Sequence, residues 1–169
     1  MRKAFTLIEM LISVTILSIM MVFLYKSYAS LNSSNYFLKK ELNIIKSQQL
    51  KKRVVFLDFS LALDKKVNII NQDSHVDVVF MQSSNSLHRK YNPYVAYIVK
   101  ESKLYRLESL QEFKEYPLNQ DSVFSIDSLG EVDSFRVYKS NDNLKEAYLI
   151  HAEFKQGEEI LLKVKVLED

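Results

Sequence analysis

The sequence predicts an α+β fold in which one long N-terminal helix packs on an antiparallel β-sheet. Two observations support this fold class. No glycine or proline occurs before Pro93, and apolar residues keep helical spacing well into the chain. After about residue 66 the apolar spacing changes to two, which is typical of strands. Neither an internal repeat nor a linker divides the outer part of the chain.

The predicted helix covers roughly residues 5–63. Its first 20 residues, Phe5–Leu24, would span about 30 Å, the thickness of a bilayer's hydrocarbon core. Glu9 is the one ionisable side chain in this segment. The outer part is amphipathic, and its apolar stripe should lie on the sheet. A weak helix former, "LNSSN" at 31–35, and a five-residue step in the apolar spacing at 45–50 suggest bends.

The strands are predicted from alternating apolar residues and turn signals. Val76, Val78 and Phe80 alternate with other positions. One pair of segments flanks a tight turn at Glu101-Ser102, and a second pair flanks a turn that contains Gly157. The turn signal "SNDN" at 140–143 follows a further segment. The expected strands are 94–100, 103–109, 134–139, 147–154 and 159–166. The regions 64–76 and 107–122 give no clear prediction.

The charge balance excludes a globally basic nucleic-acid-binding protein. The net charge is +2, and setting aside Arg2 and Lys3 leaves 21 basic and 21 acidic side chains. Local basic runs, "KSQQLKKR" at 46–53 and "HRKY" at 88–91, favour a solvated surface, with a nucleic-acid patch as the alternative. There is no cysteine, so disulfides and thiolate metal sites are excluded.

Enzymatic signatures are missing, and we expect no catalytic residue, no small-molecule substrate and no cofactor. The chain has no phosphate-binding glycine-rich loop, H-E-x-x-H or G-x-S-x-G pattern. His151, amid apolar neighbours, is interpreted as a structural or surface residue. Asp127, Glu131 and Asp133 suggest a solvated turn, with a calcium site as the alternative; three carboxylates do not define a calcium loop, so we expect no metal.

Three interpretations account for the N-terminus. Arg2 and Lys3 place the N-terminus in the cytoplasm and the rest of the chain outside. The segment could be a signal peptide cleaved after Ser27-Tyr28-Ala29, although it is longer than the usual apolar core and contains Glu9. It could be a plain anchor in which Glu9 is tolerated near the helix end. The third interpretation explains every feature together.

The stretch "RKAFTLIEMLISVTIL" resembles the class III leader of type IV pilins and type II secretion pseudopilins. The resemblance implies that a prepilin peptidase cuts between Ala4 and Phe5 and that Phe5 becomes N-methylated. Glu9 is then the fifth residue of the mature chain. Ala4 departs from the family pattern, which usually has glycine before the cut. Cleavage leaves a protonated amine on Phe5, and Glu9 of a staggered neighbour could pair with it.

The rest of the chain has a weaker resemblance to J-type minor pseudopilins. "RVVFLDFSLA" at 53–62 is similar to their helix end, where an aspartate precedes a small residue by four, as Asp58 precedes Ala62. The resemblance implies a leader at 1–4, a transmembrane helix at 5–25 and a pilin-like periplasmic domain at 26–169. Such a protein would sit in the inner membrane, with the N-terminus cytoplasmic.

The expected function is that of a minor pseudopilin, a structural subunit that initiates or caps a pseudopilus for type II secretion or DNA uptake. Its partners would be prepilin peptidase, other pseudopilins and the lipid bilayer. A minor subunit of a type IV pilus remains an alternative. A secreted periplasmic binding protein with a cleaved signal peptide is the alternative from another class, and an enzyme is the third.

Overall fold

The computed structural model describes residues 6–63, 67–118, 123–140, 147–155 and 157–167. The chain divides into two units, one ending at Ser47 and one covering Gln48–Asp169, and each is described by itself. Helix α1 (Leu7–Ser60) belongs to both and is uninterrupted. The predicted long helix is therefore confirmed, and it continues through both places where bends were suggested.

In the first unit, the helix is exposed along its whole length. The side chains from Leu7 to Lys46 are exposed, except for Ser27, which is half-buried. No charged residue occurs between Glu9 and Lys26. By length and composition alone, α1 could cross a membrane. An apolar, fully exposed segment of this length requires a lipid or protein environment, because water would solvate it poorly.

In the second unit, α1 ends where the chain turns into the sheet. The backbone N–H of Leu61 still bonds to the carbonyl of Leu57, but the carbonyl of Leu61 accepts the N–H of Ser84 at 3.1 Å. Ala62 then forms an isolated bridge with Ser83. The helix therefore ends at Ser60, three residues before the predicted end, because the next residues pair with the sheet.

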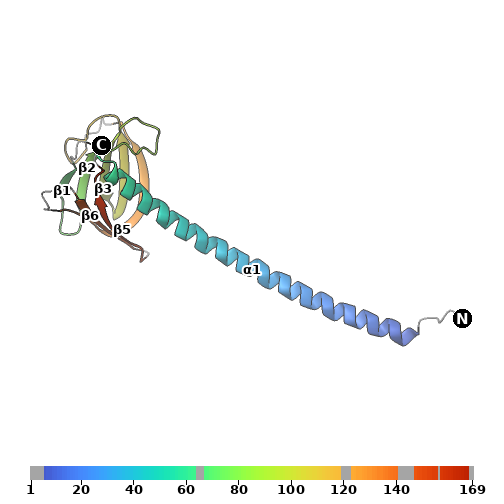
Figure 1. Cartoon of the computed structure of the whole chain (residues 1–169). Coiled ribbons are helices and arrows are strands. Elements are labelled where there is room, and N and C mark those ends of the chain that lie inside the picture. Colours follow the sequence, from blue (N-terminus) through green and yellow to red (C-terminus); the bar gives the residue numbers. More distant parts are fainter. Residues whose placement is uncertain (1–5, 64–66, 119–122, 141–146, 156, 168–169) are drawn as a thin grey trace. The chain divides into compact units, whose positions relative to one another are not determined.

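The second unit contains a seven-stranded antiparallel sheet among the described residues, with the strands in chain order. Figure 1 shows this sheet curling around the last turns of α1. Each strand hydrogen-bonds to the strand that follows it in the sequence, so the topology is a meander. The strands are β1 (Asn68–Asn71), β2 (Asp77–Gln82), β3 (Tyr94–Lys100), β4 (Lys103–Ser109), β5 (Ser125–Lys139), β6 (Ala147–Phe154) and β7 (Glu159–Lys165).

Most predicted strands are confirmed. The turn at Glu101-Ser102 joins β3 to β4, and both residues have left-handed φ angles of 52° and 58°, as a two-residue hairpin turn requires. Strand β6 has its predicted bounds, and β7 ends one residue early. Strand β5 begins nine residues before the predicted start at Ser134, and β1 was not predicted. Residues 141–143 of the expected turn lie outside the described residues.

The main core lies between the last turns of α1 and the inner face of the sheet. The Phe59 ring lies 6.1 Å from the Tyr97 ring and 5.8 Å from the Tyr148 ring, measured between centroids. Val55, Phe135 and Ile150 belong to the same cluster, each at most 2% exposed. This core fixes the helix end against β3, β5 and β6, which positions the charged cluster described below.

A second core covers the other face of β2, β3 and β4. Val78, Phe80 and Leu107 are buried there beneath Phe113, which stacks on Phe80 with ring centroids 5.8 Å apart. Strand β2 is therefore buried on both faces, and Val79 on its other face joins the main core. The alternation expected for an exposed strand does not hold, because the segment after β4 folds back over the sheet.

Candidate membrane and assembly site

Glu9 lies in the first turn of α1 and is held by Thr6. Its Oε2 accepts hydrogen bonds from the backbone N–H of Thr6 at 2.9 Å and from the Thr6 hydroxyl at 2.8 Å. This is a capping arrangement, in which the carboxylate three residues into the helix satisfies an N–H at its start. The T-x-x-E spacing was visible in the sequence, but the sequence analysis did not identify this role.

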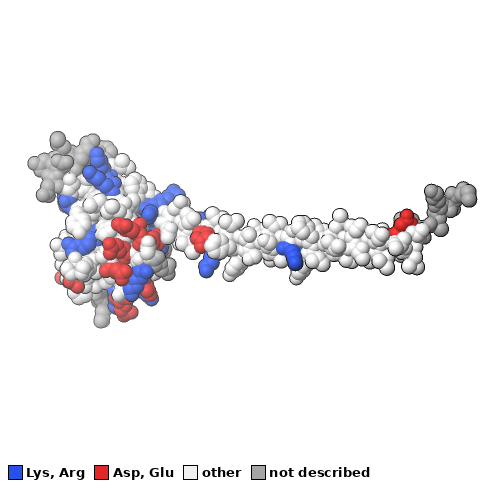
Figure 2. All heavy atoms as spheres, turned by 90° about the horizontal axis from the view of Figure 1, so that it is seen from below, with Lys and Arg blue, Asp and Glu red and all other residues white. Residues whose placement is uncertain are grey.

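The polar side chains of the following turns are also satisfied within the helix. The hydroxyls of Ser13, Thr15 and Ser18 each donate at 2.8 Å to a backbone carbonyl three or four residues earlier. Figure 2 shows a long stretch of the helix without charged side chains. A helix with satisfied hydroxyls and one capped carboxylate costs less to place in lipid than one with free polar groups.

Ala4 and Phe5, between which the cut is predicted, lie outside the described residues. Of the three predicted site residues, the structure therefore describes only Glu9. It lies at the end of the apolar segment, next to the predicted cut. Its position agrees with a carboxylate that could meet a terminal amine, while its assembly role stays a prediction.

The N-terminus matches one known family motif. Residues 1–25 match the prokaryotic N-terminal methylation motif. This motif supports a class III leader of the type IV pilin kind, and so processing by prepilin peptidase and assembly with other pilin-like subunits. It also indicates a structural subunit rather than an enzyme.

Together with the apolar helix, the N-terminal methylation motif is consistent with a pilin-like protein anchored in the inner membrane. The motif covers 25 of the 169 residues. No curated protein and no solved structure is significantly similar to the chain. The role of the second unit, the outer domain at Gln48–Asp169, therefore depends on its own geometry.

A buried charged cluster joins the end of α1 to the sheet. Arg106 on β4 donates from Nε to Asp58 Oδ2 at 2.7 Å and from Nη2 to Asp58 Oδ1 at 3.0 Å. Its Nη1 donates to Glu108 Oε2 at 2.7 Å, and the Tyr97 hydroxyl donates to Asp58. All three charged side chains are fully buried. The single positive charge of the guanidinium pairs with both carboxylates, which would otherwise be more costly to bury.

The cluster shifts the pKa values of its members. Burial raises the pKa of the Tyr97 phenol well above its usual range, and the negative charge of Asp58 raises it further. Burial alone would lower the pKa of Arg106, but hydrogen bonds and attraction from Asp58 raise it overall. Burial would also raise the pKa of Glu108, yet hydrogen bonds from Arg106, Ser86 and the Leu87 N–H hold it below its ordinary value.

Sequence reasoning identified Asp58 but missed its partners. Arg106 and Glu108 stand two apart in "LYRLES", so they lie on the same face of a strand as Leu104. Alternating apolar and charged residues usually indicate an exposed face. Here this face of β4 points into the protein. Arg106 forms ion pairs there with Glu108 on the same strand and with Asp58 on α1.

The basic run at 88–91 mostly serves the fold. His88 contacts Asp127 at 2.9 Å, and Lys90 Nζ donates to the Glu108 carbonyl at 2.6 Å and to Ser125 Oγ at 3.0 Å. In the run at 46–53, Lys51 pairs with Glu158 at 3.0 Å. These contacts engage His88, Lys90 and Lys51 within the fold, and the nucleic-acid patch considered as an alternative is not tested by them.

The predicted turn around Asp127, Glu131 and Asp133 is wrong. All three residues lie in β5, which continues through this segment. Asp127 faces His88, and Glu131 contacts Lys155 at 3.8 Å. Among the described residues, no group of three potential metal ligands comes together. The strand continues because Gly130, with φ 124°, accommodates the register shift opposite Leu104 and Tyr105.

His151 lies on the outer face of β6, as the surface interpretation predicted. Its Nε2 contacts Glu159 at 3.0 Å and Glu153 at 3.6 Å. The ring therefore bridges two exposed carboxylates on neighbouring strands. No nucleophile shares hydrogen bonds with it in the described part of the chain, so this arrangement does not resemble a catalytic one.

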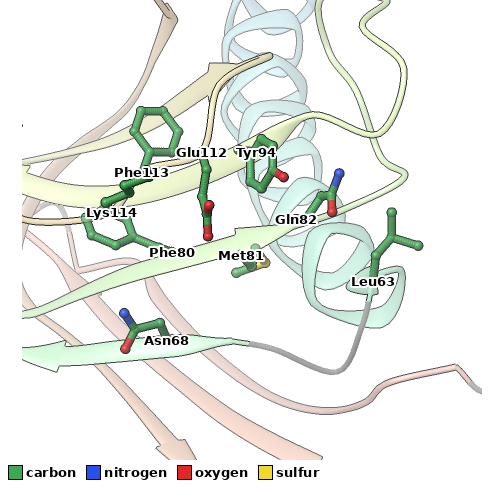
Figure 3. A pocket seen from close by; sticks show the side chains of 9 residues that line it. All are labelled: Leu63, Asn68, Phe80, Met81, Gln82, Tyr94, Glu112, Phe113 and Lys114. Atoms are coloured by element: carbon green, nitrogen blue, oxygen red, sulfur yellow. The ribbon is translucent and has the colours of Figure 1, made fainter. Parts of the chain in front are cut away.

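An open pocket of about 400 Å³ lies beside the C-terminal end of β2. Figure 3 shows the side chains of Glu112, Tyr94, Phe80 and Met81 among those that line it. Asn68 of β1 and Leu63 after α1 line the opposite side. The described lining mixes polar groups, among them Glu112 and Lys114, with core side chains.

Proposed function

We propose that this chain is a minor pseudopilin, a non-enzymatic subunit that initiates or caps a periplasm-spanning pseudopilus for type II secretion or DNA uptake. The observation that carries the proposal is the leader "RKAFTLIE", followed by an apolar helix whose single carboxylate lies in its first turn. The α+β domain with a helix packed on an antiparallel sheet supports it. A minor subunit of a type IV pilus shares these features.

The proposal divides the chain into a leader at 1–4, a transmembrane helix at 5–25 and a periplasmic domain at 26–169. Arg2 and Lys3 keep the N-terminus in the cytoplasm by the positive-inside tendency. The Thr6 cap lowers the cost of placing Glu9 near the bilayer surface while the subunit is alone. After cleavage, the Phe5 amine of a neighbour offers Glu9 a charged partner, which is stronger than a neutral donor.

Processing is tested by the intact mass of the protein extracted from membranes. We expect the loss of Met1 to Ala4 and the addition of one methyl group. The variant Ala4→Gly restores the usual family residue and should be processed at least as completely. A mature chain starting at Ser30 would instead establish a secreted protein with a cleaved signal peptide.

The role of Glu9 is tested by Glu9→Gln, with Glu41→Gln in the exposed outer part of α1 as the matched control. Glu9→Gln keeps the shape and makes the segment more apolar, so membrane insertion should be retained. We expect reduced cross-linking to partner pseudopilins and reduced secretion or DNA uptake. Unchanged cross-linking and transport in both Glu9→Gln and Glu9→Leu would exclude an assembly role for the carboxylate.

The orientation is tested with a single reporter cysteine, because the chain has none of its own. Val123 is 81% exposed in the outer domain. A Val123→Cys variant in spheroplasts should react with a membrane-impermeant maleimide. Labelling that requires lysis of the spheroplasts would contradict the proposed periplasmic position.

A further inference from the structure

Helix α1 carries a continuous line of apolar side chains along the first unit. The line begins at Leu7 and advances by three and four residues in turn as far as Ile45, and every position on it is apolar except Asn35. An average step of 3.5 residues is the repeat of a coiled coil. The part that follows the apolar segment comprises six residues, which we call the seam: Tyr28, Leu31, Asn35, Leu38, Leu42 and Ile45.

The seam is exposed. Its five apolar side chains are between 46% and 69% exposed, and Asn35 is exposed as well. In the second unit the same line continues over Gln49, Lys52 and Phe56, which are also exposed, so the sheet leaves this side of the helix end uncovered. Under the proposed function, on which this inference rests, the seam lies outside the membrane. Exposed leucines on successive turns are unfavourable there, and they commonly mark a contact surface.

Charged side chains flank the seam in a regular pattern. With the seam at heptad positions a and d, Asn35 occupies an a position, Glu41 a g position and Lys46 the following e position. Both charged side chains are exposed. In two parallel helices that lie in register, a g residue of one helix faces the next e residue of the other. Glu41 of each helix would therefore meet Lys46 of its partner.

We propose that the seam binds the seam of a second copy of this chain in a parallel, in-register, two-stranded coiled coil. Both copies are anchored by the same N-terminal segment, so their helices run in the same direction. The two-fold axis lies between the helices and parallel to them, and it sets each seam residue against its own counterpart. A shift by one heptad would set the Asn35 amide against Tyr28 or Leu42 without a hydrogen-bond partner, so Asn35 fixes the register.

No like charges face each other in this arrangement. Glu41 and Lys46 form two equivalent ion pairs. Lys39 is the one further charge at an e or g position between residues 27 and 46, and it faces Ser34 of the partner. The remaining lysines of residues 26–47 occupy f positions, which point away from the partner helix. The seam is therefore complementary to itself, as an isologous contact requires.

The self-contact is separate from the contact proposed for Glu9. Glu9 falls at a c position, which points away from the partner helix. A stagger between filament neighbours, which would bring Glu9 to the Phe5 amine of another subunit, moves Asn35 out of line with its own counterpart. The coiled coil therefore forms between copies that are not yet assembled. Tyr36 and Phe37 lie at outward b and c positions and stay available to other subunits.

The length of the line sets the strength of the self-contact. The seam alone covers less than three heptads, which is short for a coiled coil in dilute solution. From Leu7 to Ile45 the line is about 57 Å long and about 10 Å wide, or about 570 Å² per copy, which approaches the about 800 Å² per partner of a stable interface. The part in lipid adds packing without a hydrophobic driving force. Anchoring in one membrane raises the effective concentration of the two copies.

The test uses the full chain in its membrane, produced without other pseudopilins. The chain has no cysteine of its own. A Leu31→Cys variant should form a disulfide-linked dimer on mild oxidation, because position d faces its counterpart. The matched control is Ser33→Cys, which is equally exposed to solvent but lies at position f, too far from its counterpart for a disulfide.

A Leu31→Cys chain that stays monomeric, or that cross-links only to a different protein, overturns the proposal. Equal cross-linking of Leu31→Cys and Ser33→Cys does the same, because it would report random collision. The intact mass of the same samples reports leader processing, so a failure of the leader prediction is seen separately from a failure of the self-contact.

The register is tested by Asn35→Asp in the Leu31→Cys background. This change sets two carboxylates against each other at the axis and should lower the cross-linked fraction at pH 7 about tenfold. The matched control is Asn43→Asp, the same chemical change at an exposed b position, and it should leave the fraction unchanged. Equal effects of the two variants overturn the in-register arrangement.

The ion pairs are tested in the same background. Glu41→Lys and Lys46→Glu should each lower the cross-linked fraction about threefold, since each replaces two ion pairs with two like-charge contacts. The double variant reverses both pairs and should restore cross-linking. Glu41→Gln should lower self-cross-linking by less and leave cross-linking to other pseudopilins unchanged. A double variant that remains as low as the single variants overturns the pairing of Glu41 with Lys46 and with it the register.

Discussion

Helix α1 carries one carboxylate near each end, and the two are stabilised in different ways. Glu9 accepts hydrogen bonds from Thr6, three residues away in the sequence. Asp58 pairs with Arg106, 48 residues away on β4. The first arrangement forms as soon as the helix forms. The second exists only when the sheet has folded around the helix end.

The surroundings of the two carboxylates differ accordingly. Around Glu9 the side chains on all sides of the helix are exposed. Around Asp58 one side of the helix is buried, with Phe59 and Asp58 both 0% exposed. One continuous helix therefore has a segment that could cross a membrane at one end, by length and composition, and a core element at the other. Local interactions stabilise the first end, and tertiary packing stabilises the second.

Loss of Arg106 should produce the largest effect. Arg106→Met leaves Asp58 and Glu108 buried without a counter-charge, which should lower the free energy of unfolding of the outer domain by about 3–5 kcal/mol. Urea unfolding followed by circular dichroism measures this loss. Arg53→Met, on the exposed side of the same helix, should change it by less than about 0.5 kcal/mol. Equal losses in both variants would show that the cluster does not stabilise the domain.

Acid should weaken the same cluster. The folded state holds the pKa of Glu108 below its ordinary value, so ionised Glu108 favours folding above about pH 4.3. This contribution disappears as the pH falls through the folded-state pKa. We expect the urea midpoint to fall between pH 6 and pH 3. Glu108→Gln should be less stable at pH 7 but should lose less on acidification, and a slope identical to that of the parent chain would contradict this assignment.

The partly exposed pair between α1 and the segment before β7 should contribute less. Lys51 and Glu158 are 3.0 Å apart, with side chains 23% and 7% exposed. Lys51→Met removes the charge from the ion pair and also from above the Phe154 ring, where the Lys51 Nζ lies 4.6 Å from the centroid. We expect the free energy of unfolding to fall by about 1 kcal/mol, because solvent screens part of the attraction. A loss as large as that of Arg106→Met would mean that the degree of burial does not determine how much each ion pair stabilises the domain.

The cap at the start of α1 should have the smallest and most local effect. Thr6→Ala removes the hydroxyl and should destabilise the first turn of the uncleaved chain by about 1 kcal/mol. Hydrogen exchange of the amides of residues 7–10 in detergent micelles should accelerate, while the urea midpoint of the outer domain stays constant. Thr15→Ala, whose hydroxyl bonds within the helix, is the control. A shifted midpoint would show that the two ends of α1 are coupled.

The sequence by itself determined the features that depend on neighbouring residues. The absence of glycine and proline before Pro93 and the helical apolar spacing predicted one long helix, and α1 is uninterrupted. The leader and the position of Glu9 follow from a short linear motif, which the family comparison recovered at residues 1–25. The hairpin at Glu101-Ser102 depends on a two-residue turn between two apolar segments, and it was predicted correctly.

Only the tertiary structure decided which faces of the strands are buried and which charges meet. Phe113 covers the second face of β2, so an apparently one-sided strand lies inside the protein. Arg106 seems to belong to an exposed face until the curled sheet brings it onto Asp58. The period of apolar residues shows which side chains share one face of a strand. It does not show which segment covers that face. Burial and long-range charge pairing depend on segments far apart in the chain, and those come together only on folding.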